Sequence, residues 1–275
     1  MGWAGALVPP DPPDAGVTAP VTTAPKCRPS GVNLTCVNLD AFLGISAAGT
    51  AFMLIAPCLL AADFARLGEA LRLIKSAGAP MVHIDVMDGH FVPEISVGQP
   101  VIRSVRQATD LVLDLHLLIE RPERYVKEFL DAGADRITIH AEATPNLHRT
   151  LGLIRSRGAK AGLGLNPATP LEAATDALPD IDYLTILSAD LGFPQDSYLP
   201  GTVAKVEAAC DLRRRRRLNF SIEVDGGIAE EQVEVLGRAG ADILVAGSDI
   251  FQKDPETRLA KMIELAASSQ QVSRV

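Results

Sequence analysis

The chain has 275 residues, 47% of them hydrophobic, which is enough to build one large core or two small ones. Its 26 basic and 34 acidic residues give a formal net charge of −8, which argues against a polyanionic partner such as nucleic acid. The five arginines Arg213–Arg217 are a local exception. No aromatic residue interleaves them and they stand at the predicted end of a helix, so we expect a solvated helix end rather than a phosphate-binding patch.

The cysteines and the apolar segments favour a cytoplasmic protein without membrane spans. Residues 42–62 carry no charge over 21 residues, which is long enough to cross a bilayer. Gly44, Gly49 and Pro57 interrupt them, however, and their second half is better explained as a strand. The cysteines have neither paired metal-ligand spacing nor the density of a secreted disulfide scaffold, so no disulfide is expected. They are Cys27, Cys36, Cys58 and Cys210.

Residues 1–50 differ in composition from the rest of the chain. They are rich in Pro, Ala, Thr and Gly, and two Pro-Pro pairs occur within the first 13 residues. Such a segment cannot bury enough apolar surface to order itself, so a disordered extension is predicted. Met53 stands directly before the first predicted strand and is a candidate start of translation. Mass spectrometry of the native protein would reject that hypothesis by finding peptides from upstream of Met53.

From residue 53 to residue 269, short apolar runs rich in Val, Ile and Leu alternate with amphipathic segments. This alternation is typical of repeated βα units around a parallel sheet. The predicted strands are Met53–Ala56, Met81–Asp85, Val112–His116, Arg136–His140, Lys160–Leu165, Tyr183–Leu187, Phe220–Val224 and Ile243–Ala246. The helical patterns between them include Phe64–Ser76, Pro122–Ala132, Leu147–Arg157 and Glu230–Ala239, several of which end in Ala-Gly-Ala, where glycine provides a left-handed cap.

Eight such units predict an α/β fold with a single (β/α)₈ TIM barrel. The nearest alternative is an open, doubly wound sheet, which would carry a glycine-rich dinucleotide-binding turn after its first strand. Pro57-Cys58-Leu59-Leu60 stands there instead. The barrel is therefore the expected architecture.

Polar residues at the carboxyl ends of barrel strands are the candidates for chemistry, because active sites of this fold are built there. His83 and Asp85 are two apart on the second strand and so project to one face, which Met87 continues as the strand ends. His116 closes the third strand and Asp225 closes the seventh. Each of these residues alone would more often be structural, but four together at catalytic strand ends favour a functional site.

The donor set predicts the kind of ligand. Two imidazoles and two carboxylates suit one divalent cation of borderline softness, namely Zn²⁺, Fe²⁺, Mn²⁺ or Co²⁺, better than Mg²⁺ or Ca²⁺. A second, weaker signal comes from Gly226-Gly227 after the seventh strand and Gly247-Ser248 after the eighth. Small residues and free backbone N–H groups there favour phosphate binding, although glycines could also merely turn the chain.

From about Met53 to Ala267 the sequence resembles the ribulose-phosphate 3-epimerase family. The most specific motif is the run Asp85-Val86-Met87-Asp88-Gly89-His90-Phe91-Val92-Pro93. The other motifs occur in the same order as in the family. They are Ile55-Ala56-Pro57, Ala62-Asp63-Phe64, Asp114-Leu115-His116-Leu117, His140-Ala141-Glu142, Leu165-Asn166-Pro167-Ala168-Thr169-Pro170, Glu223-Val224-Asp225-Gly226-Gly227 and Val245-Ala246-Gly247-Ser248.

The resemblance implies an enzyme that interconverts D-ribulose 5-phosphate and D-xylulose 5-phosphate in the pentose phosphate pathway. It implies a metal held by His83, Asp85, His116 and Asp225, with the two aspartates carrying protons on opposite faces of the substrate. The metal would stabilise the ene-diolate that forms when the C3 proton leaves. A homo-oligomer and a small sugar-phosphate partner are also implied. The implied substrate contacts are Cys58, Met87, His116, Gly192, Phe193, Gly226, Gly227, Gly247 and Ser248.

The chain departs from the family pattern at three places. Cys58 replaces the usual serine with a weaker hydrogen-bond donor. Leu118 and Leu187 stand where methionines usually line the site. At Asp190–Asp196 the family usually shows Asn-Pro-Gly-Phe-Gly-Gly-Gln, a mobile lid over the substrate. Here Pro194 replaces a glycine and fixes a backbone angle, and Asp196 adds negative charge near a dianionic phosphate, so weaker lid closure and weaker phosphate binding are expected.

Three functions remain open from the sequence. The first is the pentulose 5-phosphate epimerase, and the second is a hexulose 6-phosphate (allulose 6-phosphate) 3-epimerase with the same metal and a longer pocket. The third is a catalytically weakened barrel with a binding role, because fold alone does not imply function. A metal-free decarboxylase is disfavoured, since such barrels use a lysine among paired aspartates and no strand end here carries one.

Overall fold

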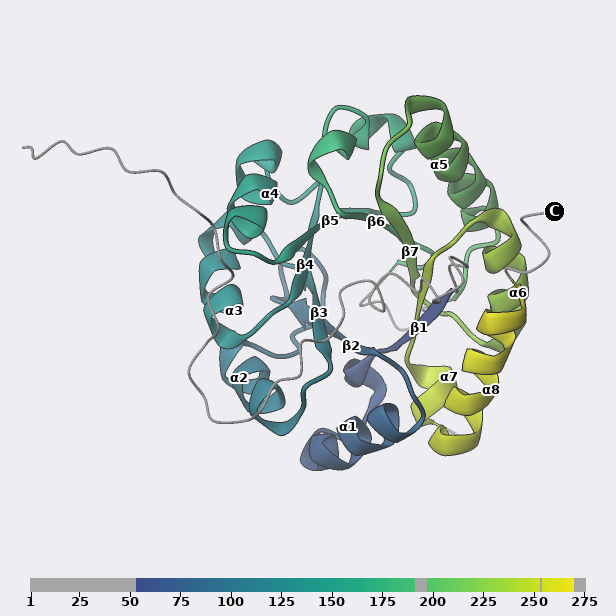
Figure 1. Cartoon of the computed structure of the whole chain (residues 1–275). Coiled ribbons are helices and arrows are strands. Elements are labelled where there is room, and N and C mark those ends of the chain that lie inside the picture. Colours follow the sequence, from purple (N-terminus) through teal and green to yellow (C-terminus); the bar gives the residue numbers. More distant parts are fainter. Residues whose placement is uncertain (1–52, 191–196, 253, 270–275) are drawn as a thin grey trace, which may run out of the picture. The chain divides into compact units, whose positions relative to one another are not determined.

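The computed structural model describes residues 53–190, 197–252 and 254–269, so the predicted extension at residues 1–50 lies outside the described part. Eight parallel strands form a single sheet, and helices follow them along the chain (Figure 1). The predicted TIM barrel is confirmed. Its strands are β1 Leu54–Pro57, β2 Met81–Met87, β3 Val112–Leu118, β4 Arg136–His140, β5 Lys160–Leu165, β6 Tyr183–Leu187, β7 Ser221–Asp225 and β8 Ile243–Ala246.

The helices lie outside the strands in Figure 1. The α-helices are α1 Leu67–Ser76, α2 Gln99–Ala108, α3 Val126–Ala132, α4 Leu147–Ser156, α5 Thr202–Arg216, α6 Glu230–Ala239, α7 Ser248–Phe251 and α8 Pro255–Ser269. Short 3₁₀ segments are η2 Leu59–Ala61, η3 Phe64–Arg66, η4 Pro122–Arg124, η5 Leu171–Ala174 and η6 Leu178–Asp180. Among the described residues, no helix has the length and apolar character that crossing a membrane requires.

Strands β4, β5, β6 and β8 have the predicted bounds, whereas β2 and β3 each run two residues further. The reason is that their parallel pairing continues to the pair Met87 and Leu118, whose side chains are buried. The strands β1 and β7 both begin and end one residue later than expected. The sequence predicts that the arginine run is solvated. Arg214–Arg217 are indeed exposed, whereas Arg213 is partly buried and pairs with Asp242.

The order of strands in the sheet is β1-β8-β7-β6-β5-β4-β3-β2, which leaves β1 and β2 as neighbours around the barrel. A parallel bridge between Cys58 and His83 links the end of β1 to β2. In the parallel pairing of β2 with β3, Asp85 lies opposite His116. Closure of the sheet therefore gathers Cys58, His83, Asp85 and His116 in one place, although they come from three strands.

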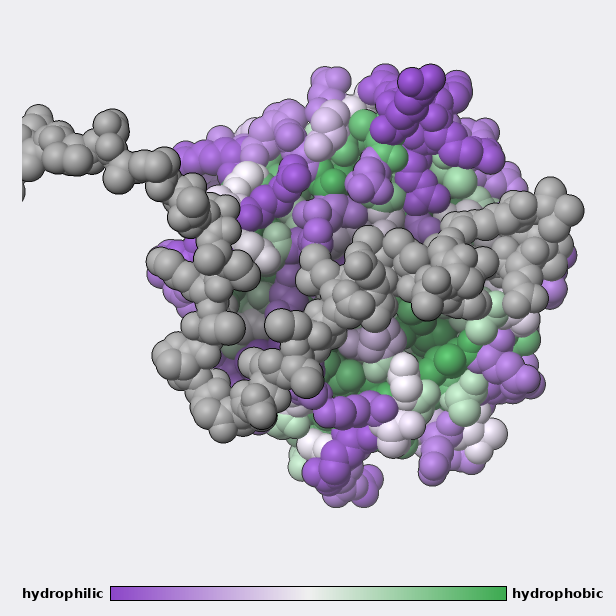
Figure 2. Space-filling view, in the orientation of Figure 1, coloured by the Kyte–Doolittle hydropathy of each residue, from purple (hydrophilic) through white to green (hydrophobic). Residues whose placement is uncertain are grey.

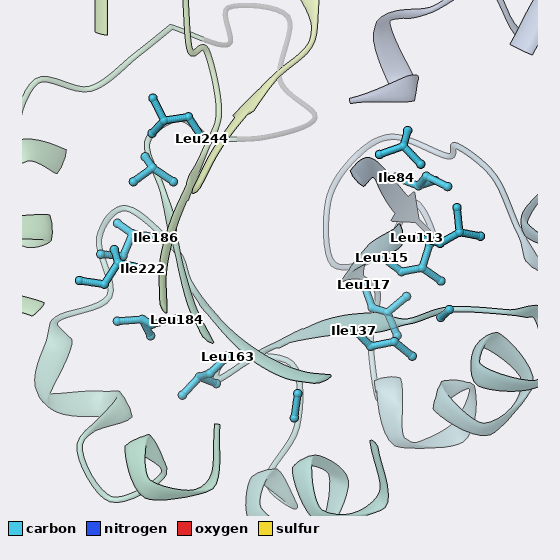
Figure 3. Packing of buried hydrophobic residues seen from close by; sticks show 14 of the residues in the cluster. Ile84, Leu113, Leu115, Leu117, Ile137, Leu163, Leu184, Ile186, Ile222 and Leu244 are labelled. Carbon is cyan, nitrogen blue, oxygen red and sulfur yellow. The ribbon is translucent and has the colours of Figure 1, made fainter. Parts of the chain in front are cut away.

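Alternation along each strand separates two environments. Ile84, Leu115 and their counterparts on other strands belong to the main apolar cluster, which joins the sheet to the helices (Figure 3). The intervening residues, such as His83, Asp114 and His116, point the other way because successive side chains of a strand alternate. The sheet thus has its large apolar core outside and a mainly polar interior along β2 to β7. Hydrophilic side chains gather over the outer helices (Figure 2).

Candidate metal centre and active site

The four predicted ligand residues come together in the barrel interior. His83 and Asp85 lie on β2, His116 on β3 and Asp225 at the end of β7. Each of these residues is at most 4% exposed to solvent. Together they form a group in which one ligand atom from each side chain lies within 4.8 Å of the others. The structure therefore brings together the four residues that the sequence places at strand ends, while their role as metal ligands stays a prediction.

Distances between the facing atoms fit a cation. Nδ1 of His116 lies 3.0 Å from Oδ1 of Asp85 and 3.1 Å from Oδ2 of Asp225. Nε2 of His83 lies 3.3 Å from the same Asp85 oxygen and 3.7 Å from the same Asp225 oxygen. Donor atoms bound at about 2.0 Å to a four-coordinate ion are spaced by about 3.3 Å. The cluster could therefore hold one divalent metal ion with little movement of its side chains.

The electrostatics of the cluster also favour a bound cation. Burial lowers the pKa of a histidine, but Asp85 and Asp114 outweigh this effect and hold the pKa of His83 well above its usual value. For His116, burial is again outweighed, here by Asp225 and Asp85, which raise its pKa to about 9. Burial opposes ionisation of Asp85, but the two histidines keep its pKa below the ordinary value. Carboxylates that favour charged imidazoles in this way would also favour a divalent cation.

The ring of His83 is oriented by a residue that the sequence reasoning did not single out. Oδ2 of Asp114 lies 2.9 Å from Nδ1 of His83, which leaves Nε2 of His83 facing the aspartates. Metal-ligating histidines commonly use such a carboxylate to fix the tautomer. Asp114 precedes His116 by two residues on β3, so the same alternation that identified His116 could have found it.

Asp114 belongs to a buried polar group below the ligands. Arg136 on β4 donates to Asp114 from Nε at 2.9 Å and to Glu223 from Nη2 at 2.7 Å. Its guanidinium lies 3.9 Å from the ring centroid of Tyr183, whose hydroxyl donates to Asp114. Burial and the nearby Asp114 raise the pKa of Glu223 to about 7. This group satisfies its buried charges internally and holds Asp114 against His83.

Cys58 and Met87, predicted as substrate contacts, lie beside the ligands. Sγ of Cys58 is 3.0 Å from Oδ2 of Asp85. Met87 packs with Leu118 and Leu187, the two positions at which the chain departs from the usual methionines. Val92 and Ala189 complete this small buried cluster, with Leu60 and Phe91 packed against it. The substitutions therefore keep an apolar wall at the mouth of the barrel.

The glycines predicted to bind phosphate occupy tight positions. Gly226 and Gly227 have φ values of 113° and 64°, a region that side chains rarely adopt. A Cβ atom on Gly227 would lie 2.9 Å from the backbone nitrogen of Tyr198. Gly247 precedes α7, which begins at Ser248, and a Cβ atom there would lie 3.4 Å from Cβ of Cys58. These positions border the metal centre, while their contact with a phosphate stays a prediction.

Gly192 and Phe193, the remaining predicted substrate contacts, lie outside the described residues, as does the rest of the loop 191–196. A separate cavity of about 400 Å³ is lined by Glu123, Asn146 and Arg149, among others. It lies over η4 and α4, on the outside of the barrel, and contains none of the strand-end residues. The metal centre, rather than this cavity, carries the concentration of ionisable groups on which chemistry depends.

Comparison with known proteins gives a consistent result. A sequence profile of the ribulose-phosphate 3 epimerase family matches residues 54–251. The chain is 40% identical over 210 residues to the ribulose-phosphate 3-epimerase of Bacillus subtilis, covering 76% of this chain and 97% of that protein. It is 44% identical over 201 residues to the ribulose-phosphate 3-epimerase of a Synechocystis species, covering 72% and 87% respectively.

Among solved structures, a 3-hexulose-6-phosphate synthase is similar with a TM-score of 0.58 and 20% identity, covering 78% of this chain and 100% of that one. The tryptophan synthase alpha subunit of Legionella pneumophila is similar with a TM-score of 0.52 and 14% identity, covering 80% and 93%. At these identities the structural matches support the barrel fold alone. The extent and identity of the sequence matches go further, and the chain belongs to the ribulose-phosphate 3-epimerase family.

Proposed function

We propose that the protein epimerises D-ribulose 5-phosphate and D-xylulose 5-phosphate at C3 with the help of one bound divalent metal. The observation that carries the proposal is the buried group of two histidines and two aspartates at the strand ends. Family membership supports the pentulose phosphate as the substrate. A purely binding role is not favoured, because the candidate ligand set is complete. No feature of the described residues favours the hexulose phosphate.

The metal would be held by His83, Asp85, His116 and Asp225. Bound there, a divalent cation supplies Lewis-acid stabilisation of the negative charge that develops on the substrate oxygens when the C3 proton leaves. Zn²⁺, Fe²⁺, Mn²⁺ and Co²⁺ all suit a donor set of two imidazoles and two carboxylates.

The two aspartates carry the protons in this proposal. Asp85 and Asp225 enter the site from β2 and β7, and each turns one carboxylate oxygen towards the histidines. In the proposal the second oxygen of each side chain exchanges the proton with the substrate; that of Asp85 also accepts a hydrogen bond from the thiol of Cys58. Transfer of the C3 proton to one aspartate, followed by protonation from the other on the opposite face, inverts the carbon centre.

The surrounding residues would position the substrate and exclude water. The apolar cluster of Met87, Val92, Leu118, Leu187 and Ala189 lines the mouth of the barrel beside the ligands. A dry site strengthens the electrostatic interactions that stabilise the developing charge. Glycines 226, 227 and 247 let the chain turn and pack closely at these strand ends, and their backbone N–H groups would contact the phosphate.

A coupled assay with ribulose 5-phosphate before and after chelation tests the proposal. Activity should disappear when the metal is removed and return on addition of one of the four candidate ions, each tested separately. Full activity in protein shown by elemental analysis to be metal-free would overturn the metal role. Product analysis by NMR with the pentulose and hexulose phosphates decides between the two substrates, and faster turnover of the hexulose phosphate would overturn the assignment.

We also propose a cytoplasmic location and a symmetric homo-oligomer. The location is supported by Cys58 and Cys210, both of which are free thiols. Cell fractionation tests it. The oligomer follows from the family resemblance, and size-exclusion chromatography with light scattering measures it.

A further inference from the structure

The second ring nitrogen of His116 has an unusual partner. Nε2 of His116 lies 2.8 Å from Nε2 of His140, which is fully buried on β4. The ring centroids are 5.0 Å apart and the ring planes differ by 19°. Together these values describe rings that meet nitrogen to nitrogen near a common plane, which is the geometry of a hydrogen bond rather than of face-to-face contact.

The other ring nitrogen of His140 faces an acceptor. Nδ1 of His140 lies 3.1 Å from Oε2 of Glu142. The second oxygen of Glu142 accepts a hydrogen bond of 2.9 Å from the backbone N–H of Asn166, and another from the hydroxyl of Thr169. Burial opposes ionisation of Glu142, but donation from His140 and these neighbours lowers its pKa to about 2. Glu142 is therefore a carboxylate at neutral pH and can only accept hydrogen bonds.

The loop after β5 anchors Glu142 in turn. Lys205 on α5 donates to the carbonyl oxygens of Asn166, Pro167 and Thr169 at 3.2, 2.7 and 2.8 Å. Opposite His140 on β5 stands Gly164, where a Cβ atom would lie 2.7 Å from Nε2 of His140. Glycine at this position leaves the space that His140 needs to reach His116.

The direction of the hydrogen bonds follows from these contacts. Since Glu142 can only accept, Nδ1 of His140 must carry its hydrogen, and in a neutral ring Nε2 of His140 then accepts. Nε2 of His116 must therefore donate. When His116 is neutral, as a metal ligand must be, that leaves the lone pair on Nδ1 of His116, the atom that faces Asp85 and Asp225, to bind a cation.

We propose that His140 and Glu142 are positioning residues that fix the metal-binding tautomer of His116 through the contacts Glu142–His140–His116. The inference deepens the proposed function and rests on it, because it requires the metal centre. It also accounts for two sequence motifs that have no other role in the site, namely His140-Ala141-Glu142 and the Asn166–Pro170 segment.

Replacement of Glu142 by glutamine tests the direction of the hydrogen bonds with a small change in shape. Both carboxylate oxygens of Glu142 accept hydrogen bonds, whereas the side-chain amide of glutamine has only one acceptor oxygen. Asn166 and Thr169 both donate to one oxygen of Glu142, whereas His140 alone faces the other, so the amide oxygen is expected to stay with Asn166 and Thr169. The NH₂ group then faces Nδ1 of His140 and forces the hydrogen of His140 onto Nε2. The N–H groups at Nε2 of His140 and Nε2 of His116 would then face each other with no acceptor between them. Zinc affinity, measured by competition with a chelating dye, should fall about 10- to 100-fold in Glu142→Gln.

Two further measurements separate this role from a general structural effect. Histidine ring ¹⁵N NMR of the zinc-loaded protein should show the Nδ1–H tautomer of His140 in the wild type and its loss in Glu142→Gln. His140→Gln can present an amide oxygen to His116 in place of the imidazole. In that background Glu142→Gln should cause no additional loss of zinc affinity, because the tautomer that Glu142 controls is gone. Glu128→Gln, an exposed position on α3, is the matched control and should leave zinc affinity unchanged.

The outcomes also separate this inference from the proposed function. A wild-type protein that fails to bind zinc, iron, manganese or cobalt overturns both. A wild type that binds zinc while Glu142→Gln binds it equally well overturns the positioning role alone. The same conclusion follows if His140 of the wild type carries its hydrogen on Nε2.

Discussion

The thiol of Cys58 lies 3.0 Å from Oδ2 of Asp85, the carboxylate oxygen that does not face His116. Burial and the charges of Asp85 and Asp225 raise the pKa of Cys58 well above its usual value, so the thiol stays protonated. Cys58 therefore donates a hydrogen bond to the proposed proton carrier. The contact exists because the β1–β2 bridge at Cys58 and His83 closes the barrel.

Replacing Cys58 tests this contact. Cys58→Ala should lower kcat/KM for ribulose 5-phosphate by about 10-fold, because a buried hydrogen bond to a charged group is lost. Cys58→Ser keeps a donor, and a stronger one, so it should be at least as active as the wild type. Steady-state kinetics on both variants measure the difference. Wild-type activity in Cys58→Ala would remove the thiol from the mechanism.

Replacing either proposed proton carrier should abolish epimerisation without unfolding the protein. Asp85→Asn and Asp225→Asn each remove an anionic ligand and a proton acceptor, so kcat should fall at least about 100-fold. Circular dichroism melting checks the fold, and Asp176→Asn, an exposed position, serves as the control. Near-normal turnover with solvent deuterium incorporation at C3 in either variant would contradict the assignment.

Ionised Glu142 should stabilise the fold in a way that depends on pH. Its folded-state pKa of about 2 lies below the ordinary glutamate value of 4.5. The stabilisation is therefore complete above the unfolded-state pKa and is lost as pH falls towards 2. Urea unfolding at pH 7 should show Glu142→Gln less stable by on the order of 2 kcal/mol, a figure reduced for solvent screening of this partly exposed side chain, and the difference should shrink between about pH 5 and pH 2. A difference that does not change with pH would show that the charge of Glu142 is not the cause.

Two glycine replacements should have opposite effects on stability. A Cβ atom on Gly162 would overlap the ring of Tyr183 and lie 2.5 Å from Oγ1 of Thr138 inside the barrel. Gly162→Ala should therefore lower the free energy of unfolding by roughly 1–3 kcal/mol. Gly152 lies in α4 with open space around it, so Gly152→Ala should raise the free energy of unfolding by about 0.5–1 kcal/mol. Urea denaturation of both variants measures the changes, and equal effects would contradict this account of the interior.

For the loop 191–196, the sequence predicts weaker binding of the substrate phosphate, and a triple replacement tests this prediction. Replacing Pro194 by glycine, Gln195 by glycine and Asp196 by glutamine restores the family pattern and removes a negative charge. KM for ribulose 5-phosphate should fall with a smaller change in kcat, because binding of the phosphate is improved uniformly. An unchanged or higher KM would indicate that the loop suits another sugar phosphate, and the hexulose phosphate should then be the better substrate.

The strands and the four candidate ligand residues could be predicted from the sequence because the information is local. Apolar runs such as Lys160–Leu165 identify a strand by composition. Alternation then assigns His83 and Asp85 to one face and Ile84 to the other, whatever the rest of the chain does. The barrel end at which catalysis occurs follows from the repeated βα order. Fold class and candidate ligands thus required no knowledge of distant contacts.

The partners of those ligands were decided only by the tertiary structure. His116 meets Asp225 across 109 residues of sequence and His140 across 24, and no local pattern states which of its nitrogens faces which neighbour. The hydrogen bond that Cys58 donates to Asp85 depends on barrel closure, and the one that His83 donates to Asp114 depends on the register of β3 against β2. Hydrogen bonds form over about 3 Å and require a specific orientation, whereas sequence periodicity specifies only a face. The candidate ligand residues could therefore be identified from local sequence, whereas their ring orientations and tautomers depend on packing between strands.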